Sequence, residues 1–157
     1  MQFNPTDFLK LAEQLHKDDK YQHVIQAALR TSISRAYYAA FLTVRETIRV
    51  KLQDTELIYL FEEVARSGFI HSCIMRIIGR ANRYMEKIYG KLFKMRKESD
   101  YDLNISITPK DVEEALGIAK KIISLSKELS NSIEVNRISS IVADYYNKLT
   151  SRSGRTR

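Results

Sequence analysis

The stretch of this chain that most constrains its fold runs from Ser34 to Ile48 and contains neither glycine nor proline. Apolar residues recur there every three or four positions, a spacing that places them on one buried face of a helix. With the residue that precedes the stretch, they are Ile33, Tyr37, Ala40, Phe41, Val44 and Ile48. Small alanines beside tyrosine rings let a second helix approach closely. The stretch therefore predicts a central helix packed against other helices.

Turn-forming residues are scarce throughout the chain, with only 5 Gly and 2 Pro in 157 residues, which favours an all-helical chain. We expect helices that begin near Asn4 and Thr108, a short helix between 54 and 68, and helices over 22–52, 72–99 and 134–149. The predicted fold is an all-α, up-and-down helical bundle with four to five core helices plus a C-terminal helix. We divide the chain into a bundle at 1–132, an amphipathic helix at 133–150 and a basic disordered tail at 151–157.

Composition excludes several classes of protein. No apolar run is long enough for a membrane span, the N-terminal residues lack the pattern of a signal peptide, and the one cysteine, Cys73, fits a reducing compartment. We therefore expect a cytoplasmic protein with no membrane partner. A zinc cluster is excluded by one cysteine and three scattered histidines, and no glycine-rich phosphate loop occurs, so no metal and no cofactor are predicted.

The predicted helix over 72–99 carries a row of cations two residues out of phase with its apolar stripe. Two residues turn a helix by about 200°, so the basic row faces away from the core. Glu86 is its one nearby acid in the sequence. With a net charge of +7, the chain attracts polyanions, and the row is interpreted either as a solvated face or as a contact for RNA or a nucleotide. Its members are Arg76, Arg80, Arg83, Lys87, Lys91 and Lys94.

Two motifs occur in order along the chain: R-A-Y-Y-A-A-F at 35–41 and R-x-x-x-D-Y at 96–101. Together they resemble the HEPN family (higher eukaryotes and prokaryotes nucleotide-binding), over about residues 5 to 130. The resemblance implies a bundle of the HEPN type, a homodimer, and RNA or a nucleotide as ligand. It also implies a minimal nucleotidyltransferase as partner, in a pair of the toxin–antitoxin kind.

Many HEPN proteins are metal-independent ribonucleases whose motif is Arg, four to six residues, then His. The arginine holds a phosphate, and the histidine takes a proton from the 2′-hydroxyl and returns one to the leaving oxygen. Counting from Arg96, the positions for the histidine hold Tyr101, Asp102 and Leu103. A tyrosine, with an ordinary pKa near 10, is a poor general base at pH 7. The resemblance therefore carries over Arg96 as an anion contact but carries over no base, which argues against nuclease activity.

Asp100 and Tyr101 remain candidates beside Arg96. In one class of HEPN toxins, a tyrosine after the motif's histidine receives AMP from the partner nucleotidyltransferase, and Tyr101 lies near that position. The structural alternative is that Asp100 pairs with Arg35 or Arg96 while Tyr101 packs on Tyr37 or Tyr38, in a buried network. If the protein is catalytic, the site residues are Arg96, Asp100 and Tyr101.

The sequence thus predicts a module that binds a nucleotide or RNA. The predicted contacts are Arg35, Arg76, Arg80, Arg83, Lys87 and Arg96. Two other functions remain open: a metal-independent ribonuclease toxin with a rearranged site, and a non-catalytic helical adaptor without a ligand.

Overall fold

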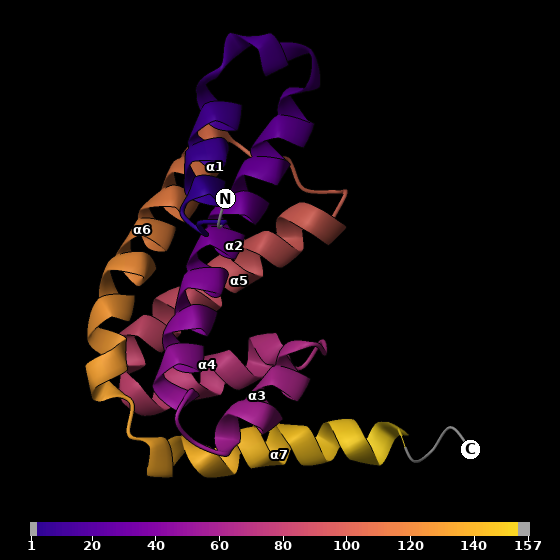
Figure 1. Ribbon diagram of the computed structural model, residues 1–157. Coiled ribbons are helices and arrows are strands. Elements are labelled where there is room, and N and C mark those ends of the chain that lie inside the picture. The colour runs from indigo at the N-terminus through magenta and orange to yellow at the C-terminus, as the bar shows by residue number, and fades with distance from the viewer. Residues whose placement is uncertain (1–2, 154–157) are drawn as a thin grey trace. The chain divides into compact units, whose positions relative to one another are not determined.

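The computed structural model describes residues 3–153, and within this range it holds α-helices, one short 3-10 helix and no strand (Figure 1). The all-α class predicted from the sequence is confirmed. In chain order the elements are α1 (Asp7–Lys17), the 3-10 helix η1 (Asp19–Val24), α2 (Ile25–Leu52), α3 (Leu57–Ala65), α4 (Ile70–Ala81), α5 (Arg83–Tyr101), α6 (Pro109–Ser132) and α7 (Val135–Ser153). No helix of the described range combines the length and apolar character that crossing a membrane requires.

The apolar face predicted on α2 is confirmed. Ile33, Tyr37, Ala40, Phe41, Val44 and Ile48 are all buried. Helix α2 begins at Ile25 rather than at the predicted Gln22, because residues up to Val24 form the 3-10 helix η1. Asp18 starts that helix, since its carboxylate accepts the backbone N–H of Lys20 at 3.0 Å.

The single helix predicted over 72–99 is wrong, because the chain breaks at Asn82 into α4 and α5. The Asn82 backbone is extended, with φ −154° and ψ 104°. Its side-chain oxygen accepts the Met85 N–H at 2.9 Å, so Asn82 caps the start of α5. Asparagine favours such a cap over a helix interior, where its side chain competes for backbone groups.

The break also overturns the continuous basic row. Arg76 and Arg80 belong to α4, whereas Arg83 is the first residue of α5. The three arginines therefore do not lie in one row along the face of a single helix. Glu86 is not the one acid beside these cations either. Lys91 pairs with Glu114, Lys94 with Glu98 and Arg76 with Asp144.

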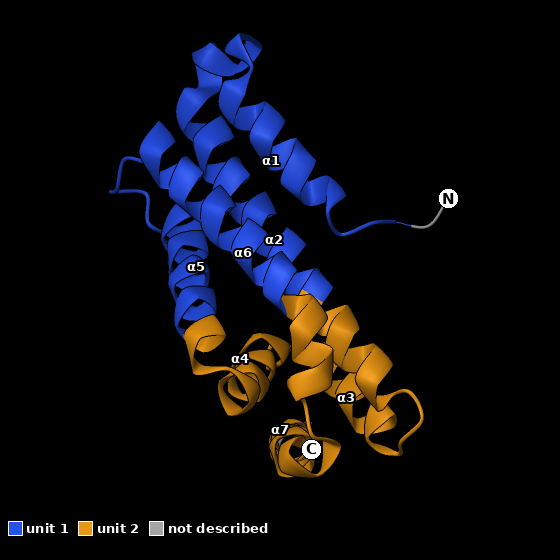
Figure 2. Ribbon diagram, turned by 90° about the vertical axis from the view of Figure 1, so that its left-hand side faces the viewer, with its two compact units in different colours: residues 1–43, 87–125 blue, residues 44–86, 126–157 orange. Residues whose placement is uncertain are grey.

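The described residues fall into two compact units, coloured separately in Figure 2. Unit 1 holds the chain up to Thr43 and Lys87–Leu125, which includes α1, the first part of α2, most of α5 and most of α6. Unit 2 holds Val44–Glu86 and the chain from Ser126, which includes α3, α4 and α7. Each unit combines segments that are distant in the sequence.

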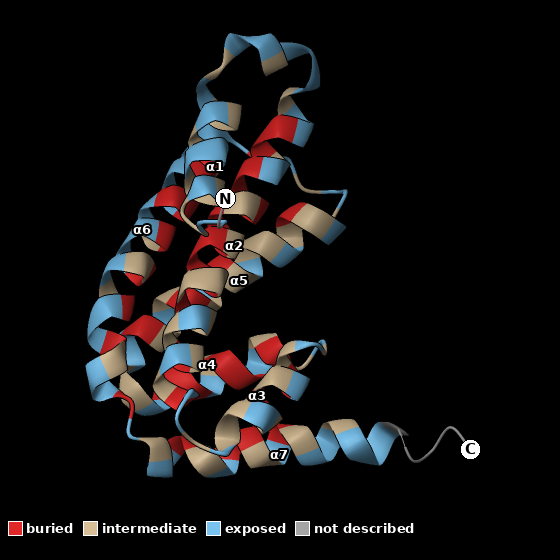
Figure 3. Cartoon of the chain, in the orientation of Figure 1, coloured by how far each residue is buried: buried red, intermediate tan, exposed pale blue. Residues whose placement is uncertain are grey.

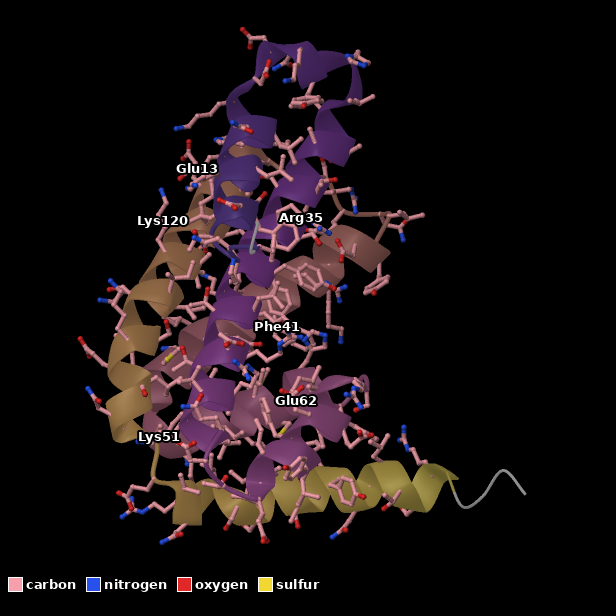
Figure 4. The ribbon with its side chains drawn as sticks, viewed as in Figure 1. Glu13, Arg35, Phe41, Lys51, Glu62 and Lys120 are labelled. Carbon is pink, nitrogen blue, oxygen red and sulfur yellow. The ribbon has the colours of Figure 1, made fainter. Side chains whose placement is uncertain are left out.

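The core of unit 1 is built around Tyr37 of α2. Its ring lies 5.8 Å from Phe41, 5.6 Å from Phe93 and 6.0 Å from Tyr89, between ring centroids. These contacts join α2 to α5. Helix α1 is held to α2 by Ser32, whose hydroxyl donates to the Ala12 carbonyl, and to α6 by the ion pair between Glu13 and Lys120, labelled in Figure 4.

In unit 2, α7 packs against α3 and α4 of the same chain. Buried positions alternate with exposed ones along α7, as Figure 3 shows. The apolar side chains that face inward are Ile138, Ile141, Val142 and Tyr145. The helix continues to Ser153, so residues 151–153 are helical although they were expected in the basic tail. The rest of that predicted tail, 154–157, lies outside the described residues.

Candidate functional site

Arg96 lies on α5 and is turned toward α2 within unit 1. Its side chain is 13% exposed, and its Nε is 2.8 Å from Oδ2 of Asp100, one helical turn later. The N–H of Nε does not point at that oxygen, so this contact is an ion pair without a hydrogen bond from Nε. Ser34 of α2 also reaches the same carboxylate oxygen, at 3.4 Å. Asp100 therefore links Arg96 to α2.

Two tyrosine rings hold the Arg96 guanidinium in place. Its central carbon lies 5.6 Å from the centroid of the Tyr38 ring and 5.2 Å from that of Tyr101, distances typical of cation–π contact. One terminal nitrogen donates to the hydroxyl oxygens of Tyr38 and Tyr101 at 3.3 and 3.4 Å. Of the predicted buried network, the pair of Arg96 with Asp100 is present, whereas Tyr101 is exposed and contacts Arg96. Tyr38 is the member of the cluster from α2.

Arg35, labelled in Figure 4, supplies a second guanidinium to the same cluster. It lies 5.2 Å from the Tyr38 ring and 5.0 Å from the ring of Phe8 on α1. Within residues 3–153, its Nε is buried and has no hydrogen-bond partner. An unpaired buried N–H costs free energy unless an acceptor reaches it, so Arg35 can accommodate an anion.

The cluster carries an excess of positive charge. Arg35 and Arg96 both lie against Tyr38, and in the described range the one carboxylate that pairs with either of them is Asp100. Burial acts to lower the pKa of Arg96, but the Tyr38 and Tyr101 oxygens and the Asp100 carboxylate outweigh it, so the pKa is raised. Arg96 therefore stays charged at every physiological pH.

Arg30, which the sequence reading did not single out, fixes the end of α5. Its guanidinium donates to the carbonyl oxygens of Ser99 and Asp102 at 2.9 Å each, and to that of Ile105 at 2.5 Å. Gln26 adds a reciprocal pair of bonds to the backbone of Ile107, at 2.8 and 3.0 Å. Because both residues belong to α2, the last turn of α5 and the loop that follows it are anchored to α2. The Arg96 cluster is formed beside this junction.

Tyr101 occupies the first position where the HEPN motif would place histidine, and its side chain is exposed by 69%. The three histidines lie on other elements: His16 on α1, 3.7 Å from Glu113, His23 in η1 and His71 on α4. The described cluster thus contains two cations and hydroxyl groups but no imidazole. It can hold an anion, while proton transfer near neutral pH lacks its usual group.

The other predicted cations do not contact Arg96. Arg76, Arg80 and Arg83 line a pocket of unit 2, and Lys87 is exposed on α5. The structure therefore brings the predicted residues together in two groups. Arg35 and Arg96 form one of them in unit 1, and the three arginines of α4 and α5 form the other in unit 2.

The comparisons with known proteins agree with the family that the two sequence motifs indicate. The family model of the HEPN domain matches residues 6–129. An uncharacterized protein of Methanocaldococcus jannaschii is 31% identical over 123 residues, which are 71% of each of the two chains. No solved structure matches. The matched range contains Arg35, Tyr38, Arg96, Asp100 and Tyr101, and since it spans most of the sequence, the chain belongs to the HEPN domain family.

Proposed function

We propose that this protein binds the phosphate of a nucleotide or of RNA between Arg35 and Arg96. Membership of the HEPN family supports a nucleotide- or RNA-related function. The observation that carries the proposal is the placement of two guanidiniums against one tyrosine ring, of which only Arg96 is paired with a carboxylate in the described range. A phosphate brings the second negative charge and several acceptor oxygens, which guanidinium N–H groups bind well.

Binding without cleavage is the form of the function that the residues favour. Metal-independent cleavage of RNA needs a group that removes the 2′-hydroxyl proton near pH 7, and no histidine belongs to the described cluster. Arg96 and Asp100 are tied to each other and to α2, which suits a positioning role. A ribonuclease toxin and an adaptor without a ligand are the two alternatives that the experiments below address.

The biological setting that we propose is a cytoplasmic homodimer paired with a minimal nucleotidyltransferase, in the manner of a toxin–antitoxin pair. The surface beside the cluster supports a protein partner, because Tyr101 and Leu103 are 69% and 84% exposed. The Tyr101 hydroxyl, which accepts from Arg96, would be accessible to such a partner.

Binding of a short RNA and of ATP, measured by calorimetry at two salt concentrations, tests the proposal. Arg96→Gln and Arg35→Gln should each weaken binding by about 10- to 100-fold, the effect of losing a charged hydrogen bond. Arg66→Gln is the matched control, because Arg66 is 73% exposed and pairs only locally with Glu63. Binding that neither variant changes would contradict the proposed site, and absence of binding by the unaltered protein would favour the adaptor.

Cleavage is tested separately with labelled single-stranded and structured RNA, in chelator and with micromolar protein. We expect intact RNA after hours. Cleavage that Arg96→Gln abolishes would show a catalytic site without histidine and would replace the binding proposal by the ribonuclease alternative. Purification from the native cells with its bound proteins tests the pairing, which requires that a nucleotidyltransferase is recovered.

A further inference from the structure

A pocket of about 320 Å³ is lined by residues of unit 2 alone, none of which belongs to the Arg96 cluster. Its walls come from the second half of α4, the first turn of α5 and α7. Arginine is the commonest residue among them. The polar and small residues that line the pocket are Arg76, Gly79, Arg80, Arg83, Glu86 and Ser140.

The positive charges around this pocket exceed the negative ones. Arg83 pairs with Glu86 at 2.9 Å, and Arg76 lies 3.8 Å from Asp144. Arg80, one turn after Arg76 on α4, forms no ion pair with any residue of the described range. Three cations and two carboxylates leave one positive charge uncompensated at the pocket, held on a guanidinium that can donate several hydrogen bonds.

Glu86 places a carboxylate in the pocket, directly over Gly79. A Cβ at Gly79 would collide with the Glu86 side-chain oxygens, so the absence of a side chain at Gly79 makes room for this carboxylate. Glu86 is 32% exposed and lies at the end of a flexible side chain. The pocket thus already holds one acidic group beside its arginines, paired with Arg83, which belongs to the protein and can move away.

We propose that this pocket binds a terminal phosphate group, carried either by a nucleotide or by the 5′ end of RNA, which displaces the Glu86 carboxylate. A terminal phosphate carries more charge than a carboxylate and offers three acceptor oxygens to the forked donors of Arg76, Arg80 and Arg83. The volume is at the lower end of small-ligand sites, so the pocket accommodates the phosphate end of a ligand. The site shares no residue with the phosphate contact proposed above and can exist without it.

Calorimetry with pyrophosphate at low salt tests this inference. The measurements use the Arg35→Gln/Arg96→Gln double variant, so that an anion held in unit 1 does not contribute. Addition of Arg80→Gln should weaken binding at least tenfold. Addition of Glu86→Gln should tighten it several-fold, because the competing carboxylate is removed. Arg66→Gln, another exposed arginine of unit 2, should leave the affinity unchanged.

Three outcomes would overturn the inference: no binding of pyrophosphate, equal affinity with and without Arg80→Gln, or weaker binding after Glu86→Gln. Circular dichroism of each variant establishes that it is folded. The source of the phosphate is then identified with ATP and with an RNA oligonucleotide made with and without a 5′-phosphate. Preference for the phosphorylated oligonucleotide over ATP identifies RNA ends as the ligand, and the reverse identifies nucleotides.

Discussion

Arg30 stabilises the helix end on which the Arg96 cluster depends. Its three backbone acceptors are the carbonyl of Ser99, in the last turn of α5, and those of Asp102 and Ile105, which follow the helix. Carbonyls at and beyond a helix end have no partner within the helix. Arg30→Met keeps the apolar stem but removes every donor. We expect the free energy of unfolding to fall by roughly 2–4 kcal/mol, measured by urea denaturation. Arg49→Met, which breaks an exposed pair with Glu46, should cost below about 1 kcal/mol, and an equal loss in both variants would contradict the argument.

The buried tyrosine pair of unit 1 predicts how stability depends on alkaline pH. Burial raises the pKa of Tyr37 and of Tyr89, whose hydroxyl oxygens lie 3.2 Å apart. In the unfolded chain these hydroxyls ionise near pH 10, whereas in the folded protein they stay neutral to higher pH. The stability that these two neutral, buried hydroxyls contribute to the folded protein is therefore complete below about pH 10. It is lost as the pH rises further, because the unfolded chain ionises first.

Urea midpoints at pH 9 and pH 11 measure this loss. Tyr89→Phe should reduce the fall in the urea midpoint between pH 9 and pH 11, because one hydroxyl with a raised pKa is removed. Tyr59→Phe is the control, since Tyr59 is 75% exposed, and it should leave the fall unchanged. An unaltered fall in Tyr89→Phe would show that the alkaline transition comes from other groups.

Part of the site is predictable from the sequence because some of its contacts are local. Arg96 and Asp100 are four residues apart on one helix, and this spacing alone makes their pairing one of few options. Tyr38 was expected, with Tyr37, as a candidate packing partner of Tyr101; its ring lies against both arginines, a contact that was not predicted. Arg30 escaped notice because its partners are backbone carbonyls, which have no signature in the side-chain pattern.

At the scale of elements, the end of α4 shows where periodicity misleads. Ile78 and Met85 are both buried, so the apolar repeat continues across the break and predicts one helix. Two residues indicate that the helix ends here. Gly79 is a weak helix former, and Asn82 is a residue type favoured as an N-cap. By contrast, the start of α6 was predicted, because Thr108 and Asp111 exchange the hydrogen bonds of a capping box, at 2.8 and 3.3 Å.

Removal of the Asn82 cap tests what separates α4 from α5. Asn82→Ala should lower the free energy of unfolding by about 1 kcal/mol, because the Met85 N–H loses its acceptor. Asn82→Asp keeps an acceptor at the same distance and should retain most of the stability. Urea denaturation followed by circular dichroism measures both. A gain in stability and in helicity for Asn82→Ala would mean that α4 and α5 fuse and that the cap does not determine the break.

For the whole molecule, the helical class followed from the scarcity of glycine and proline, whereas the division into two units did not. Which helices share a core depends on contacts between distant segments, such as that of Val44–Glu86 with the chain from Ser126. No local pattern encodes this pairing. The last helix belongs to this pairing, because the structure places α7 on α3 and α4 of the same chain.

This placement predicts that the range 1–132 is not a stable protein by itself, although we expected it to form the bundle. A chain that ends at Ser132 loses α7 and exposes the sides of α3 and α4 on which α7 packs. Exposing apolar surface to water costs about 25 cal/mol per Å². A large exposed apolar face also promotes aggregation. We expect the truncated chain to be insoluble or to lose its cooperative unfolding, while a chain that ends at Ser153 behaves as the full sequence does. Cooperative unfolding of the shorter chain at an unchanged midpoint would show that α7 contributes nothing to unit 2 and would leave its apolar side free to cover a second molecule.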